Sequence, residues 1–129
     1  MTDYSIIDKP NLLVYVFYPR GDAGPCPTYA FDVVVPVEGD VSVHCRLYKG
    51  NDAWPWILLF HGNGEVVSDY DEISFFYFKR HLNLAVADYR GYGASTGEPT
   101  FSGIIHDAPV IYHTVRAELK SRGLQDRVW

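Results

Sequence analysis

The sequence predicts an α/β fold built on a mostly parallel sheet of about four to five strands, with an N-terminal hairpin and two main helices. The run WILLF at 56–60 is continuously apolar, which is typical of a strand covered on both faces in a parallel sheet. A second apolar run, LAVAD at 84–88, follows it, and helical spacing appears after each of the two runs. Strands that alternate with helices indicate a parallel sheet with right-handed crossovers.

Length and composition predict one folded domain. The chain has 129 residues, of which 47% are hydrophobic and 21% charged, so it can bury a core without a disulfide or a metal. These values exclude two full domains and intrinsic disorder. We divide the chain into an N-terminal extension at 1–28, which has turn formers around the apolar stretch 12–18, and a domain at 29–129.

The charge balance limits the partners. Eleven Lys and Arg against sixteen Asp and Glu give a net charge of −5, so we expect neither nucleic acid nor an anionic membrane surface as a partner. No apolar stretch approaches the ~20 residues that span a bilayer, and no secretory signal is recognisable. Cys26 and Cys45 are interpreted as two ordinary thiols, which favours a cytoplasmic protein. The histidines lack metal-ligand spacing, so we expect no metal and no cofactor.

Two strands are predicted before WILLF. The β-branched run FDVVVPV at 31–37 ends near a sheet edge because it contains Pro36, and residues 38–40 supply a hairpin turn. In VSVHCRLY at 41–48, apolar and polar residues alternate, which indicates a strand with one face in water. We therefore expect His44 to face solvent.

The strand at 56–60 is expected near the centre of the sheet, followed by a glycine loop and a helix. Ser68 and Asp71 resemble a capping pair at the start of that helix, and apolar residues follow at helical spacing. The acidic residues Asp69, Asp71 and Glu72 then lie near the positive helix end. We interpret them as a solvated first turn rather than a metal site.

The last helix has apolar residues on one face between Ile104 and Leu119. Pro109 either kinks this helix or lies in its first turn, with Asp107 as the N-cap. Gly123 indicates the end of the helix, and residues 126–129 look like the start of another strand.

Two loops follow the carboxyl ends of predicted strands, where active residues of α/β sheets lie. The first is HGNG at 61–64, whose small residues let backbone N–H groups approach a ligand oxygen, as an oxyanion hole requires. From spacing alone, a tight turn explains these glycines equally well. The second loop is DYRGYGASTGEP at 88–99. Its glycines are also reminiscent of a dinucleotide loop, but no helix follows at once and Pro99 argues against phosphate binding.

The span 56–129, with weaker support from residue 31 onward, resembles the N-terminal half of an α/β-hydrolase of the esterase, lipase and acyl-peptidase type. The resemblance is carried by ILLFHGNGE at 57–65, LNLAVADYRGYGASTGEPT at 82–100 and the helix that begins near IIHDA at 104–108. It implies a partial α/β-hydrolase fold in which the backbone N–H of Asn63, with Gly64 nearby, belongs to the oxyanion hole. It also implies a small acyl substrate, and supporting roles for His61, Gly62, Asp88, Arg90, Gly91 and Gly93.

Residues 93–97, GASTG, match the nucleophile signature G-x-S-x-G, with Ser95 as the candidate nucleophile. A nucleophile elbow turns sharply from strand to helix, whereas five residues separate Asp88 from Ala94 here, and Glu98-Pro99 follows. The later triad candidates are His106, Asp107 and His113, all on or beside one helix. We therefore expect no catalytic residue in this chain.

In the family, the elbow follows the fifth strand, which begins here at about Arg127. We therefore expect the nucleophile and the other triad members beyond Trp129, and a chain that is inactive alone. The alternative is a non-catalytic binding or assembly module derived from a truncated hydrolase. Either way, the strand at 56–60 is expected to expose an edge that pairs with a second copy or with the complementing half.

Overall fold

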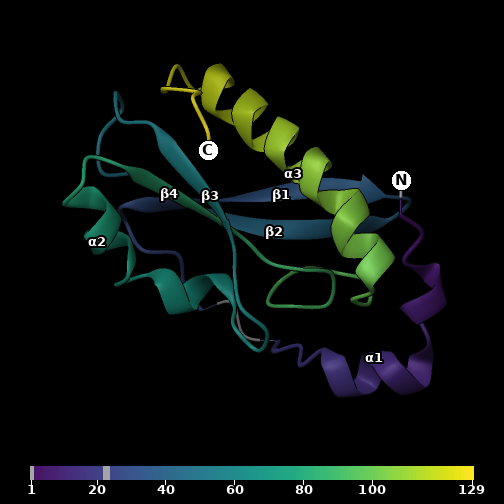
Figure 1. Cartoon of the computed structure of the whole chain (residues 1–129). Coiled ribbons are helices and arrows are strands. Elements are labelled where there is room, and N and C mark those ends of the chain that lie inside the picture. The colour runs from purple at the N-terminus through teal and green to yellow at the C-terminus, as the bar shows by residue number, and fades with distance from the viewer. Residues whose placement is uncertain (1, 22–23) are drawn as a thin grey trace.

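The computed structural model describes residues 2–21 and 24–129. In chain order the elements are the 3₁₀ helix η1 (Ser5–Ile7), α1 (Pro10–Val16), β1 (Ala30–Glu38), β2 (Val41–Tyr48), β3 (Trp56–Phe60), the 3₁₀ helix η2 (Val67–Tyr70), α2 (Ser74–Phe78), β4 (Asn83–Ala87) and α3 (Phe101–Ser121). The predicted α/β class is confirmed, with α3 on one side of the sheet and α2 on the other (Figure 1).

The sheet is mixed rather than mostly parallel. Its four strands lie in the order β1-β2-β4-β3. Strands β1 and β2 pair antiparallel, β2 pairs antiparallel with β4, and β3 pairs with β4 in parallel. The predicted hairpin at 38–40 is present, but its strand β2 enters the sheet beside β4 in the antiparallel direction, so the sheet is not mostly parallel.

The prediction that β3 lies at the centre was wrong, because β4 occupies the position between β2 and β3. On its other side β3 meets the start of a further strand, as the sequence indicated for 126–129. Trp56 forms an isolated parallel bridge with Val128, and the Leu58 N–H donates to the Trp129 carbonyl over 2.7 Å. The middle of β3 is therefore only half-buried.

Each face of the sheet has its own apolar core. On the α3 side, the alternate residues Val43, Cys45 and Leu47 of β2 pack with Ile111, Val115 and Leu119 of the helix. On the other side, a smaller cluster joins Tyr48, Val67, Leu84 and Val86 to partly buried aromatic residues of α2. These apolar residues of the alternating pattern in β2 thus face α3, as expected for a strand.

The polar face of β2 is buried, which contradicts the expectation that His44 faces solvent. His44 is 4% exposed and Arg46 is fully buried. Arg46 donates to both carboxylate oxygens of Asp32 on β1, to Asp71 after η2 and to the carbonyls of Gly24 and Pro25. The N-terminal extension and the η2 region therefore cover this face.

The first predicted helix is shorter than expected. Residues 67–70 form the 3₁₀ helix η2, and α2 spans only Ser74–Phe78. Ser68 is the N-cap of neither helix. The N-cap of η2 is Val66, whose N–H donates to the Asp69 carboxylate over 3.1 Å, and the N-cap of α2 is Ile73. Asp69 also pairs with Arg20 at 2.6 Å, so two of the three acidic residues, Asp69 and Asp71, bind basic side chains rather than water alone.

Helix α3 begins before Pro109, so the alternative start at Asp107 was wrong. Its N-cap is Thr100, whose hydroxyl accepts from the Gly103 N–H, and the Asp8 carboxylate accepts from the Phe101 and Ser102 N–H groups. These contacts stabilise a first turn well upstream of Pro109, which lies inside the helix. As predicted, the helix ends just before Gly123, which has φ +70°.

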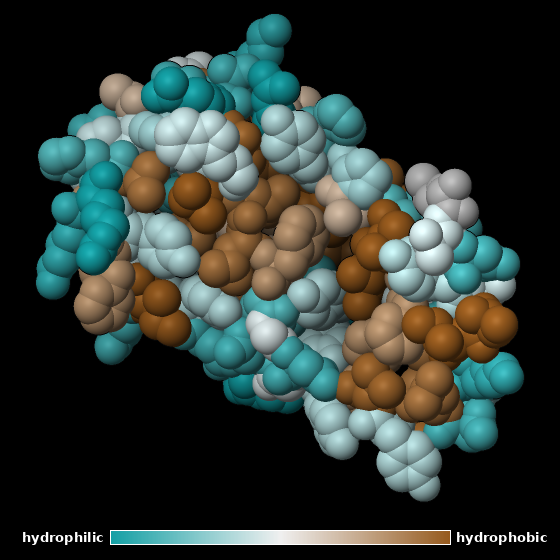
Figure 2. Space-filling model, viewed as in Figure 1, coloured by the Kyte–Doolittle hydropathy of each residue, from teal (hydrophilic) through white to brown (hydrophobic). Residues whose placement is uncertain are grey.

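The extension contains α1 where the sequence showed only an apolar stretch. Phe17 packs against Phe101 with ring centroids 5.2 Å apart, but Leu12, Val14 and Tyr15 are exposed. Figure 2 shows apolar side chains gathered on the α1 end of the molecule, at the lower right. Within residues 2–21 and 24–129, no helix is both long and apolar enough to cross a membrane.

Candidate functional site

The two loops singled out by the sequence lie side by side, because they follow the parallel neighbours β3 and β4. His61 comes directly after β3, and Asp88 directly after β4. The His61 Nε2 atom lies 2.8 Å from Asp88 Oδ1, and both side chains are fully buried. A carboxylate only accepts hydrogen bonds, so His61 Nε2 is assigned as the donor.

Asp88 organises the start of the next segment as well. Its Oδ1 also accepts from the Val67 N–H at 3.1 Å, and its Oδ2 faces His44 Nδ1 at 3.5 Å. Burial favours the neutral acid, but His44 and His61 outweigh burial and hold the pKa of Asp88 below its usual value. The buried group is therefore a carboxylate that fixes both the loop and η2.

Side chains from several elements fix the backbone of the loop 61–64. The Tyr89 hydroxyl donates to the His61 carbonyl over 2.6 Å. The Gly62 N–H donates to Glu65 Oε2 at 2.8 Å, and the Tyr70 hydroxyl holds the same oxygen at 2.7 Å. The loop conformation thus depends on side chains from both sides of it, and not on its glycines alone.

The Asn63 side chain is turned into the protein. Its Oδ1 accepts from the Tyr18 N–H at 3.1 Å and from the Tyr92 hydroxyl at 2.7 Å, and its Nδ2 donates to the Val16 carbonyl. The residue as a whole is exposed, and among the described residues its backbone N–H has no acceptor. Burial raises the pKa of Tyr92, and the backbone N–H groups of Tyr18 and Gly64 oppose this only in part.

The second loop is tied to α3 and packed closely against Asp88. Arg90 donates twice to the Asp107 carboxylate, each over 2.7 Å, and the hydrogen bonds to Asp107 are the main cause of the raised pKa of Arg90. Gly91 and Gly93 have φ of +78° and +54°. A Cβ at Gly93 would lie 2.3 Å from Asp88 Oδ2, so only glycine fits there.

Ser95 lies in a setting unlike that of a nucleophile. Its Oγ accepts from the His44 backbone N–H at 2.8 Å, and the neighbouring Thr96 N–H donates to the Ser42 carbonyl. The loop thereby continues the hydrogen bonding of β2. None of the hydrogen bonds formed in the described part of the chain joins a serine hydroxyl to a histidine ring.

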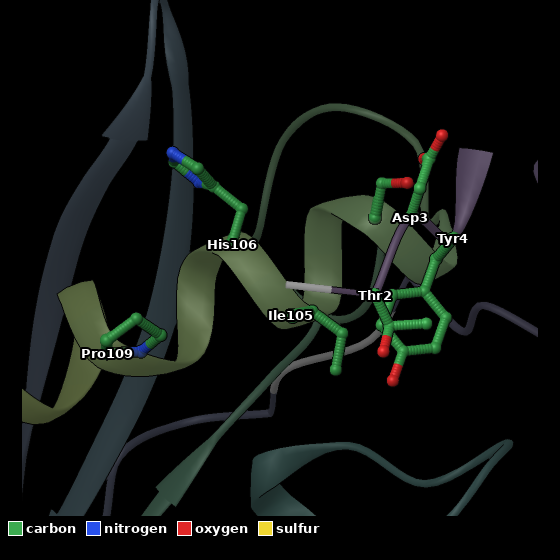
Figure 3. Close-up of a pocket in the computed structure, with 7 residues that line it drawn as sticks. Thr2, Asp3, Tyr4, Ile105, His106 and Pro109 are labelled. Atoms are coloured by element: carbon green, nitrogen blue, oxygen red, sulfur yellow. The ribbon is translucent and has the colours of Figure 1, made fainter.

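The remaining triad candidates His106, Asp107 and His113 lie on α3, and Asp107 is bound to Arg90 of the second loop. A cavity of about 300 Å³ separates residues 2–4 from α3, and His106 and Ser102 are among its lining residues. Figure 3 shows His106 pointing away from Thr2 and Tyr4. The His106 ring contacts Asp107 at 2.9 Å and is half exposed. Residues 2–21 and 24–129 contain no cluster of three or more His, Cys, Asp or Glu that could bind a metal.

Sequence reasoning found the two loops but missed several residues that fix them. Tyr18, Glu65 and Tyr92 act through hydrogen bonds to the loop 61–64, and His44 acts on Asp88. For His44, the alternation of apolar and polar residues in β2 predicted a side chain in solvent. Of these residues, only Glu65 and Tyr92 could have been suspected from the sequence, because they lie next to or within the glycine motifs.

Known proteins and solved structures match this chain over part of their own length. No family model matches the chain. The chain is 26% identical over 114 residues to the uncharacterized protein YfhR of Salmonella typhi, and 25% identical to its counterpart in Salmonella typhimurium. These stretches cover 83% of this chain but only 39% of each relative, so the chain spans well under half of their length.

Among solved structures, the chain is similar to the carboxylesterase EstE1 from a metagenomic library, with TM-score 0.60 and 22% identity over 97% of this chain and 42% of EstE1. The Pyrococcus furiosus esterase Pf2001 gives TM-score 0.60 and 18% identity over 85% of this chain and 43% of the esterase. The α/β-hydrolase of Vibrio vulnificus gives TM-score 0.56 and 20% identity over 68% and 30%. The chain therefore has the fold of part of an α/β-hydrolase.

Proposed function

We propose that residues 61–64 form an oxyanion-binding loop of a serine hydrolase that acts on ester, thioester or amide bonds of a small acyl substrate. The observation that carries the proposal is the backbone N–H of the exposed residue Asn63, which has no acceptor among the described residues while the Asn63 side chain is held by three partners. A fixed donor of this kind stabilises the charge that develops on a carbonyl oxygen under attack, at no cost of reorganisation.

In this proposal the attacking serine and its triad partners come from polypeptide outside these 129 residues, and the chain alone is a poor hydrolase or none. The hydrogen bonding of Ser95 supports this, because its Oγ accepts a backbone N–H and no histidine ring is bonded to it. An oxyanion donor accelerates a reaction only when a nucleophile is held beside it.

The outer edge of β3 is the proposed place of completion, by the remaining polypeptide or by a second copy. Trp56 and Leu58 already bond outward to residues 127–129, so by alternation the Phe60 N–H is the next outward donor. Phe60 is 38% and Trp129 62% exposed. The same edge supports the second candidate function, a non-catalytic binding or assembly module, because an open strand edge is a site of association.

A matched pair of substitutions tests the oxyanion proposal in the complete protein. Asn63→Ala removes the side chain but keeps the N–H, whereas Asn63→Pro removes both. With an activated ester as substrate, we expect kcat for Asn63→Pro to fall about 100- to 1,000-fold below that of Asn63→Ala, the loss expected for one oxyanion donor. Equal kcat values in two folded variants would contradict the assignment of Asn63. An absence of any esterase, thioesterase or amidase activity in the complete protein would instead favour the assembly module.

A further inference from the structure

A row of ionisable groups crosses the sheet and ends at the loop 61–64. His44 on β2 lies between two carboxylates, with Nε2 3.2 Å from Asp32 Oδ2 and Nδ1 3.5 Å from Asp88 Oδ2. Asp88 then contacts His61 through its other oxygen. The row runs from Asp32, whose side chain is one-third exposed, to the fully buried pair at the start of the loop.

The two carboxylates beside the His44 ring favour a proton on both of its nitrogens. A neutral imidazole has one N–H and one lone pair, and here the lone pair would face a carboxylate. Asp88 Oδ2 and His44 Nδ1 are buried and have no hydrogen-bond partner apart from this ionic contact. We propose that His44 is a positioning residue: its imidazolium, held between Asp32 and Asp88, fixes Asp88, and Asp88 in turn fixes His61 and the Val67 amide.

The surroundings of His44 favour the charged form. Burial opposes protonation, but the close contacts with the charged carboxylates of Asp88 and Asp32 outweigh it and raise the pKa of His44. Asp32 is shared with Arg46, and the Cys26 thiol of the extension lies beside it. The pKa of Asp32 is itself lowered against burial by Arg46 and His44, so the anion persists at neutral pH.

Loss of the His44 proton has a defined consequence. Asp32 is the closer carboxylate, so the remaining N–H stays with Asp32 and a lone pair faces Asp88 Oδ2. Asp88 has no room to retreat toward Gly93, because a single added carbon there would lie 2.3 Å from Oδ2. Movement of the Asp88 carboxylate away from His44 therefore changes the contacts that Asp88 Oδ1 makes with His61 and the Val67 N–H.

The test is an NMR titration of the 129-residue chain, which reports on position without requiring hydrolysis. The proposal concerns the loop itself, so its failure is distinguishable from a failure of the oxyanion assignment. We expect the His44 ring and the Val67 and Gly62 amides to titrate with one midpoint, above the ordinary histidine value of about 6.5. Above that midpoint, exchange of the Val67 amide should rise about tenfold relative to the Val115 amide in α3, the equivalent of roughly 1.4 kcal/mol for a lost charge-assisted contact.

Variants separate positioning from simple packing. Asp32→Asn does not touch the loop, yet it should lower the shared midpoint of His44 and Val67. His44→Gln should abolish the titration of the Val67 amide, whereas His106→Gln, at a half-exposed histidine, should leave it unchanged. If His44→Gln does not fold, the titrations of the wild-type chain and of Asp32→Asn still test whether His44 positions Asp88. A Val67 amide whose shift stays constant through the His44 midpoint would overturn the proposal.

Discussion

Two glycines with the same φ angle allow the packing around Asp88 to be measured. Gly39 and Gly93 both have φ +54°. A Cβ at Gly39 meets nothing within 4 Å, whereas one at Gly93 lies 2.3 Å from Asp88 Oδ2 and 3.1 Å from its Cγ. Gly39→Ala therefore reports the cost of the left-handed conformation alone, and Gly93→Ala adds the displacement of a buried carboxylate.

The expected magnitudes differ clearly. The left-handed conformation costs alanine about 1 kcal/mol. At Gly93, Asp88 must move away from the new carbon, and each of its hydrogen bonds to His61 and Val67 is charge-assisted and worth roughly 1.5–3 kcal/mol. We expect Gly93→Ala to reduce the free energy of unfolding by about 3–5 kcal/mol, against about 1 kcal/mol for Gly39→Ala.

Urea unfolding followed by circular dichroism measures both variants. The denaturant slope should stay unchanged, so that the shift in midpoint reports stability alone. If both substitutions cost the same within about 0.5 kcal/mol, the close approach of Gly93 to Asp88 is not a constraint on the folded state, and the role assigned to the Asp88 contacts is refuted.

Three further predictions concern α3, the thiols and pH. Pro109→Ala should stabilise the chain by about 1–2 kcal/mol in the same assay, because Pro109 is an exposed position inside α3 that lacks a helix N–H. In a thiol-titration assay only exposed Cys26 should react quickly in the native chain, since Cys45 is buried and burial raises the pKa of its thiol; both should react in denaturant. Asp88 and Asp107 have lowered pKa values, so they stabilise the fold above about pH 4, and thermal stability should fall as pH drops through their folded pKa values. His44 has a raised pKa, so its contribution is full below about pH 6.5 and is lost as pH rises through the folded value.

The fold class and the two loops follow from local patterns, whereas the errors arise from long-range contacts. The alternation of 41–48 correctly selects Val43, Cys45 and Leu47 for the α3 core. It cannot show that the opposite face is covered, because the groups that cover it come from the extension and from Asp71 after η2. A buried polar side chain with its own charged partners looks the same in sequence as one in water.

The same limit applies to the position of β3 and the start of α3. A continuous apolar run shows that a strand is largely covered, but its place in the sheet depends on which strand pairs with which, and β4 lies between β3 and β2. For α3, the contribution of Asp8 comes from more than ninety residues upstream, as its hydrogen bond to the Phe101 N–H shows. Locally, Pro109 favours a helix that starts near it. The caps supplied by Asp8 and Thr100 instead stabilise a start at Phe101.

The candidate site was predicted in part. The order of the two glycine motifs placed His61, Asn63 and Asp88 in neighbouring loops, and the His61–Asp88 contact brings these loops together. The sequence cannot show that Tyr18 and Tyr92 hold the Asn63 side chain while its backbone N–H has no acceptor among the described residues. That orientation depends on a segment more than forty residues upstream of the loop.

Fluorophosphonate labelling followed by peptide mapping tests the proposal that this chain holds an oxyanion loop without its nucleophile. The isolated 129-residue chain should remain unlabelled, and the complete protein should carry the label on a serine outside residues 1–129. Label on Ser95 of the isolated chain would contradict the proposal, because it would place the attacking group in the loop after β4.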